Sequence, residues 1–185
     1  MKNLSLITLF LMLLASCQPA DELVTPDGLS QIVQRSQQER SFQANLSGAL
    51  DPNSVPTACS GDLPLALLDY AISGNATHLG KLNTNLSILH HDDCNLSLAT
   101  MLLTTGVSGQ LAAANGDLVY YTGEDVINVF NLLTGSGPNG PITGTWAITG
   151  GTGRFVGASG SVTINGIVDF ATLNFNAEVN GTITY

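Results

Sequence analysis

Two histidines and two aspartates adjoin one another from His90 to Asp93, and these are side-chain types that bind divalent metal ions. On an extended strand, successive side chains point to opposite faces, so His90 shares a face with Asp92, and His91 with Asp93. Only two ligands could then meet one ion unless a turn curls around it. We therefore interpret the stretch as a polar hairpin tip preceding Cys94, and we predict no metal site and no cofactor.

The remaining titratable candidates do not form a catalytic set. His78 precedes Leu-Gly at the expected start of a strand, and the spacing names no serine, cysteine or carboxylate partner for it, so we interpret it as a structural hydrogen-bonding residue. Four acidic residues are candidates for a carboxylate pair: Asp117, Glu124, Asp125 and Asp169. Each lies at an expected turn or on a polar strand face, so we interpret all four as solvated surface. These residues therefore favour a non-catalytic protein, with an enzyme as the alternative.

A glycine cluster near residue 150 raises the question of a phosphate-binding loop. A Walker loop needs a lysine after its glycines, and none follows here. A Rossmann fingerprint needs G-x-G-x-x-G opening a helix, whereas Gly157 comes one residue late and a strand pattern follows. We predict that this cluster is a turn between strands. The glycines of this turn are Gly150, Gly151, Gly153 and Gly157. Gly116 has the same structural role in the Asn-Gly turn at 114–117.

The first sixteen residues have the layout of a lipoprotein signal peptide. A single lysine precedes an apolar run from Leu4 to Ala15, which is shorter than the ~20 residues that span a bilayer. The run ends in Leu-Ala-Ser-Cys, which matches the lipobox and predicts that Cys17 is the lipidated first residue of the mature protein. Acyl chains on Cys17 would anchor a soluble domain to a membrane. Gln18 is not the Asp that retains some lipoproteins at the inner membrane, so we expect the outer membrane.

The composition is acidic, with a formal net charge of −9 at pH 7. Such a domain would be repelled by the phosphates of nucleic acids and by anionic headgroups, so we predict neither as a partner. In the mature chain, the only basic residues form no patch in the sequence: Arg35, Arg40, Lys81 and Arg154.

Two cysteines remain after Cys17, and an exported chain reaches a compartment where they can pair. A bond between Cys59 and Cys94 is the preferred interpretation, and two free buried thiols are the alternative, because spacing alone does not establish proximity.

Residues 17–40 are polar and predict a tether, with one short helix possible from Asp27, and residues 41–185 predict an all-β domain. Apolar residues occupy every second position from Leu173 to Tyr185, which is typical of a strand with one buried face. Strands are expected at 42–50, 65–73, 82–91, 95–104, 107–114, 117–123, 126–133, 142–149, 161–170 and 172–185. We predict that they close into a small up-and-down antiparallel β-barrel of about eight strands, with a β-sandwich as the alternative.

Three turn-rich stretches also resemble those of a known group. They are ATHLGK at 76–81, ANGD at 114–117 and GGTGRFVGASGS at 150–161, and they are similar to stretches in bacterial exported proteins of the allene oxide cyclase and dirigent type. The resemblance covers residues 76–185 and implies an eight-stranded barrel related in form to calycins. No residues match either family's active site, so the resemblance implies a fold and no activity.

Three functions are consistent with an anchored barrel that lacks a catalytic set. The first is a non-catalytic module that binds a small apolar ligand or an envelope partner. The second is a cyclase or isomerase that confines a reactive lipid-derived substrate, and the third is a structural envelope or adhesion protein. We expect the aromatic residues to fill the barrel. The candidates to line a ligand site are His78, Trp146, Phe175 and Tyr185.

Overall fold

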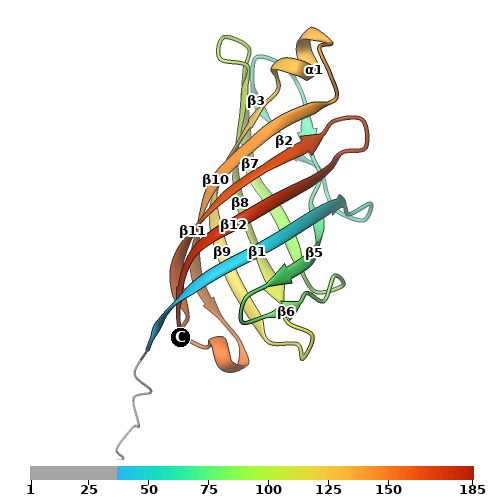
Figure 1. Ribbon diagram of the computed structural model, residues 1–185. Coiled ribbons are helices and arrows are strands. Elements are labelled where there is room, and N and C mark those ends of the chain that lie inside the picture. Colours follow the sequence, from blue (N-terminus) through green and yellow to red (C-terminus); the bar gives the residue numbers. More distant parts are fainter. Residues whose placement is uncertain (1–36) are drawn as a thin grey trace, which may run out of the picture. The chain divides into compact units, whose positions relative to one another are not determined.

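The computed structural model describes residues 37–185, which form a barrel of long tilted strands (Figure 1). The predicted signal peptide, Cys17 and nearly all of the predicted tether lie outside the described residues. The strands are β1 (Glu39–Leu50), β2 (Thr57–Ala58), β3 (Ser60–Gly61), β4 (Ala66–Leu67), β5 (Tyr70–Ala76), β6 (Gly80–Lys81), β7 (Ile88–Ser97), β8 (Leu102–Ala112), β9 (Leu118–Asn128), β10 (Asn139–Gly151), β11 (Ser159–Asp169) and β12 (Asn174–Thr184). The helices are α1 (Phe130–Thr134) and the 3₁₀ helix η1 (Gly153–Phe155). Neither helix is long and apolar enough to cross a membrane.

Eight of these strands form a ring, which confirms the prediction of an all-β antiparallel barrel. The ring runs β7-β8-β9-β10-β11-β12-β1-β5, with every neighbouring pair antiparallel. It closes where β5 pairs with β7 over only two residue pairs, Tyr70 with Leu89 and Ala71 with Ile88. The sandwich alternative fails on this closure, since a sandwich would leave two separate sheets.

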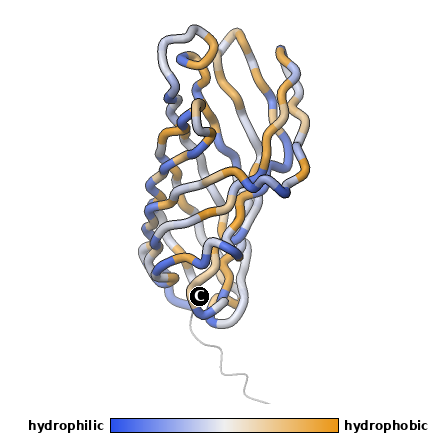
Figure 2. Tube along the Cα trace, turned by 90° about the vertical axis from the view of Figure 1, so that its right-hand side faces the viewer, coloured by the Kyte–Doolittle hydropathy of each residue, from blue (hydrophilic) through white to orange (hydrophobic). Residues whose placement is uncertain are grey.

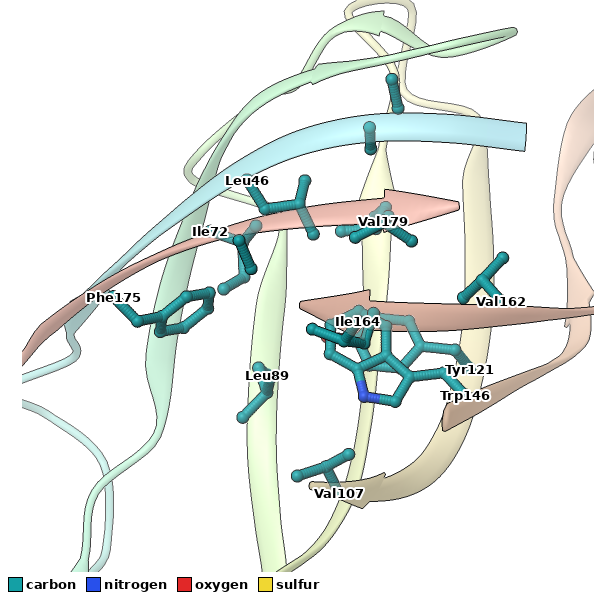
Figure 3. Packing of buried hydrophobic residues seen from close by; sticks show 14 of the residues in the cluster. Leu46, Ile72, Leu89, Val107, Tyr121, Trp146, Val162, Ile164, Phe175 and Val179 are labelled. Atoms are coloured by element: carbon teal, nitrogen blue, oxygen red, sulfur yellow. The ribbon is translucent and has the colours of Figure 1, made fainter. Parts of the chain in front are cut away.

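The period-two pattern of the sequence determines which side chains face the interior. Along β1 and β12, every second residue from Phe42 to Leu46 and from Phe175 to Val179 is buried, and the residues between them are exposed. Figure 2 shows the same alternation as changes of hydropathy along the strands. The apolar faces of all eight strands meet in one core, part of which Figure 3 shows. The barrel interior is therefore a hydrophobic core.

The predicted strand at 126–133 is wrong. Residues 118–128 form one continuous strand, β9, and the chain then turns into α1. The turn starts where the Phe130 amide donates to the Asn128 side-chain oxygen at 2.9 Å, and α1 ends at Gly135 with a φ of 70°. The apolar residues of α1 suggested a buried strand, but Phe130 and Leu132 are about half exposed.

The predicted boundary between strands 95–104 and 107–114 is also misplaced. The turn lies at residues 98–101, so β7 ends at Ser97 and β8 starts at Leu102. The polar residues of HHDD suggested a turn at 90–93, whereas the structure continues the strand through them.

The glycine cluster is a turn, as its sequence context predicted. Gly150 has a φ of 154° at a bulge in β10, and Gly153 has a φ of 56° where η1 begins; both are conformations that other residues rarely adopt. Gly151 has ordinary extended backbone, but a Cβ there would overlap the Phe155 side chain. Phe155 itself is fully buried in the core.

Candidate functional site

Asp125 is buried inside the barrel, so its interpretation as solvated surface is wrong. It lies on β9, where it follows Tyr121 and Gly123 at every second position and therefore points inward with them. Its exposed fraction is 2 %, and one carboxylate oxygen, Oδ1, accepts a hydrogen bond from the Trp146 indole N–H at 2.9 Å. Gly144 on β10 leaves the space that the carboxylate occupies, because a Cβ there would overlap it. Had residues 118–128 been recognised as one strand, this parity would have predicted the inward position.

Burial changes the acid–base chemistry of this carboxyl group. Desolvation raises the pKa of Asp125 to about 6, the Trp146 hydrogen bond opposes that rise, and the nearby Glu124 charge adds to it. The pKa of Tyr121 is raised well above its usual value, again mainly by burial. Asp125 therefore keeps its proton to higher pH than an exposed carboxyl group does.

An aromatic stack adjoins this carboxyl group. The rings of Tyr121 and Trp146 lie 4.3 Å apart and nearly parallel, at 8° (Figure 3). The Tyr121 hydroxyl donates to the Ile88 carbonyl oxygen at 3.1 Å, across to the strand that closes the barrel. The Trp146 ring occupies the space that a side chain at Gly123 would need. The stack is therefore held on both sides and does not form an open platform.

The free space beside the stack is small. It measures about 10 Å³, which is close to the least that holds one water molecule. It is lined by Phe42, Leu111, Val119, Tyr121, Trp146, Ile148, Val162 and Val179. A drug-sized ligand needs a cavity of about 300 Å³ or more. In this part of the barrel, an apolar ligand would have to displace core side chains.

The four predicted ligand-lining residues do not meet at one site. Trp146 and Phe175 both face the interior, and Phe175 packs edge-on against Tyr70 at 5.2 Å. His78 and Tyr185 lie instead at the end of the barrel where β1 begins, with their ring centroids 5.7 Å apart. They belong to a separate cluster.

His90 and His91 lie inside strand β7 and not at a hairpin tip. A bulge between His91 and Asp93 shifts the alternation along the strand. His90 donates through Nδ1 to the Asp69 carboxylate at 2.7 Å and is exposed, whereas the buried His91 donates through Nδ1 to the Leu68 carbonyl oxygen at 2.9 Å. Burial lowers the pKa of His91. Within residues 37–185, no three His, Cys, Asp or Glu side chains are placed to hold a metal ion.

Cys59 and Cys94 form a disulfide, which confirms the preferred pairing. The bond ties the segment between β2 and β3 to β7, next to the part of β7 that has no β5 partner. The disulfide therefore holds the connection between β1 and β5 against the part of β7 that does not pair with β5. Such a bond is typical of proteins outside the cytoplasm.

The outer face of the barrel carries an open depression of about 430 Å³, across β5, β1 and β12. The exposed side chains that line it are amides, one hydroxyl and one carboxylate. They are Gln43, Asn45, Asn75, Thr77, Glu178 and Asn180. No residue of this depression was identified from the sequence, because alternating polar residues on a strand indicate only that a face is wet.

The fold and these sites define an eight-stranded antiparallel β-barrel with one disulfide, a packed interior and a polar depression outside. No family model matches the chain, and no curated protein matches it. Among solved structures, it is similar to one described as the pterocarpan synthase dirigent protein GePTS1, with 17 % identity and a TM-score of 0.47 over 92 % of this chain and 98 % of that one.

Proposed function

We propose that this chain is an exported, lipid-anchored and non-catalytic binding module, and that the depression on its outer face recognises a hydroxyl-rich partner such as an envelope glycan. The observation that carries this proposal is that the outer face has more room for a ligand than the barrel interior beside Trp146 has. The outer depression measures about 430 Å³, whereas the space beside Trp146 measures about 10 Å³.

The chemistry of the outer face supports a hydroxyl-rich partner. Amide side chains both donate and accept hydrogen bonds, as sugar hydroxyls do. Polar residues without charge are also less costly to desolvate than Lys, Asp or Glu, which are depleted in interfaces. Beside the depression, β1 and β12 present uncharged exposed side chains at Ser41, Gln43, Asn45, Ser47, Asn174, Asn176 and Asn180. Two charged residues adjoin these: Glu178 in the depression and Lys81, which pairs with Asn75.

The side chains in the middle of the depression are available to a partner. Those of Gln43, Asn45 and Asn180 make no hydrogen bond to any described residue. At its edges, Thr77 donates to the Gln43 carbonyl oxygen at 3.3 Å, and Ser47 donates to Asn176 at 2.7 Å. These bonds hold only the side chains that make them, so the amides of the depression itself stay open to a partner.

The first test is binding of peptidoglycan muropeptides to the chain from Gln18, measured by calorimetry. We expect the double variant Asn45→Ala and Asn180→Ala to weaken binding at least tenfold, because each amide donates and accepts at the centre of the depression. Asn139→Ala is the matched control, since it removes an exposed amide of the outer face on β10, two strands away from the depression. Equal affinity in all three proteins would place the binding site elsewhere, and no measurable binding would exclude this partner.

The packed space beside Trp146 disfavours a cyclase or isomerase that confines its substrate. Such an enzyme needs a cavity of several hundred cubic ångströms around the reacting molecule. The space beside the aromatic stack is more than an order of magnitude smaller. A perturbed carboxyl group such as Asp125 suits proton transfer, but it touches no cavity of that size among those described.

Lipid anchoring through Cys17 is the second part of the proposal. It rests on the lipobox that ends at Cys17 and on the disulfide between Cys59 and Cys94, which is typical of exported proteins. We expect the protein purified from bacterial membranes to begin at Cys17 and to carry a diacylglyceryl mass on that residue, measured by intact mass spectrometry. Cys17→Ser should move the protein from the membrane to the soluble fraction. A wild-type protein that is soluble after export would contradict the anchor.

A further inference from the structure

One row of polar side chains crosses four neighbouring strands of the outer face, from β6 through β5 and β1 to β12 (Figure 1). Lys81 on β6 lies directly opposite Asn75 on β5. Asn75 lies opposite Asn45 on β1, and Asn45 lies opposite Glu178 on β12. Directly opposed residues point to the same face of a sheet, and all four side chains are exposed. We call these four residues the charged row, because a cation stands at one end and an anion at the other.

The side chains of the charged row are free to meet a partner. Within residues 37–185, none of them makes a hydrogen bond or an ion pair, although Ser47, Ser73 and Thr77 beside the row do make hydrogen bonds. Lys81 and Glu178 lie three strand spacings apart, which is about 15 Å between their backbones. At physiological salt, exposed charges are largely screened beyond about 8 Å. Each of the two charges is therefore available to an opposite charge on a ligand.

No other charge of these strands stands close enough to offset either end of the row. The strands that hold or adjoin the row are β1, β5, β6, β11 and β12, and their other charged residues are Glu39, Arg40 and Asp169. Each of these stands near a strand end, at least four positions along its strand from the residue in line with the row. In the turns near β6, Arg154 and Asp117 pair with each other at 3.7 Å.

The chemistry of the charged row fits a ligand that has an anionic and a cationic group on one extended chain. The Lys81 ammonium group donates hydrogen bonds to a carboxylate, and the Glu178 carboxylate accepts them from an amine. Between these ends, Asn75 and Asn45 can donate to and accept from amide groups. An extended peptide advances about 3.3 to 3.6 Å for each residue, so a short stem is long enough to span the row. A neutral glycan would desolvate both charges without pairing them, which costs free energy.

We propose that the charged row binds the peptide stem of a peptidoglycan glycopeptide, with a stem carboxylate at Lys81 and a stem amine at Glu178. This inference rests on the proposed function and deepens it, because it adds a zwitterionic peptide to the hydroxyl-rich glycan. The sugars then contact the uncharged side chains beside the row, among them Gln43 and Asn180. The two charges also give binding a direction, since a reversed stem would place like charges together.

The test is calorimetry with three forms of one muropeptide, on the chain from Gln18, which keeps all the described residues. The muropeptide is a disaccharide with a stem of L-alanine, D-isoglutamine, L-lysine and D-alanine, so it has one free amine and one free carboxylate. The second form has the amine acetylated, and the third has the carboxylate amidated.

We expect each charge of the row to matter only when its partner on the muropeptide is present. Glu178→Gln should weaken binding of the unmodified form about fivefold and leave binding of the acetylated form unchanged. Lys81→Gln should weaken binding of the unmodified form by a similar factor and leave binding of the amidated form unchanged. Each comparison is a double-mutant cycle that isolates one charge pair. Both side chains are exposed and unbonded within the described chain, so folding should be unaffected.

The matched control is Glu124→Gln, which removes an exposed carboxylate of the outer face on β9, three strands from β12. Its affinity should equal that of the wild type for all three forms. Binding that neither Lys81→Gln nor Glu178→Gln weakens would overturn the inference and leave the proposed glycan site intact. Losses that persist with the acetylated and amidated forms would overturn it in the same way. If Asn45→Ala with Asn180→Ala had no effect, the proposed site itself would fail, and a muropeptide that does not bind at all would overturn both.

Discussion

Replacing Cys59 and Cys94 together by alanine should lower the free energy of unfolding by about 3 to 4 kcal/mol, the value expected for a crosslink between residues 35 positions apart. The bond restricts the unfolded chain and holds the β2–β3 segment on β7. For a domain of this size, the loss corresponds to a fall in Tm of about 10 °C. Calorimetric or denaturant unfolding of the oxidised wild type and the double variant measures it.

The reduced wild type is the control, because it breaks the crosslink and leaves every other atom in place. It should unfold at the temperature of the double variant. If both proteins were as stable as the oxidised wild type, the disulfide would contribute nothing to folding, and its role would be local.

Asp125→Asn should remove a pH dependence of stability. The pKa of Asp125 is raised from 3.8 to about 6 by burial, so between these values the native carboxyl keeps its proton while the unfolded one loses it. The unfolded state then binds fewer protons, and stability falls as pH rises through this window. The difference between the two pKa values corresponds to about 3 kcal/mol. Relative to the wild type, the variant should therefore gain about that much stability between pH 4 and pH 7.

The amide of the variant still accepts the Trp146 N–H bond, so the fold should persist. His91 also has a shifted pKa, but it is present in both proteins and its effect cancels in the comparison. Urea unfolding at a series of pH values from 4 to 8 provides the measurement. A constant difference between the two proteins would show that Asp125 titrates as an exposed carboxyl does.

The sequence by itself determined the class of fold, because side-chain alternation along a strand is local. The residues from Leu173 to Tyr185 predicted the buried face of β12, and the Asn-Gly turn predicted the hairpin between β8 and β9. The glycine cluster could also be interpreted correctly, since a phosphate loop needs a lysine and a helix that are missing there.

Positions at strand ends were predicted less well, because several local conformations compete there. The apolar residues of α1 have the composition of a strand, and only the Asn128 turn and Gly135 make them helical. The polar residues from His90 to Asp93 have the composition of a turn, and only pairing with β8 keeps them extended. The misplaced break near residue 125 then hid the inward position of Asp125.

Only the tertiary structure decided which distant residues share a site. Barrel closure pairs β5 with β7, the register of β10 on β9 brings Trp146 to Asp125, and packing leaves about 10 Å³ beside the aromatic stack. None of these follows from periodicity. The strand order also places Lys81 and Glu178 in one row, although they are 97 positions apart in the sequence. The physical reason is that alternation determines which face of a strand is buried, whereas the order and register of the strands determine which side chains meet across the barrel.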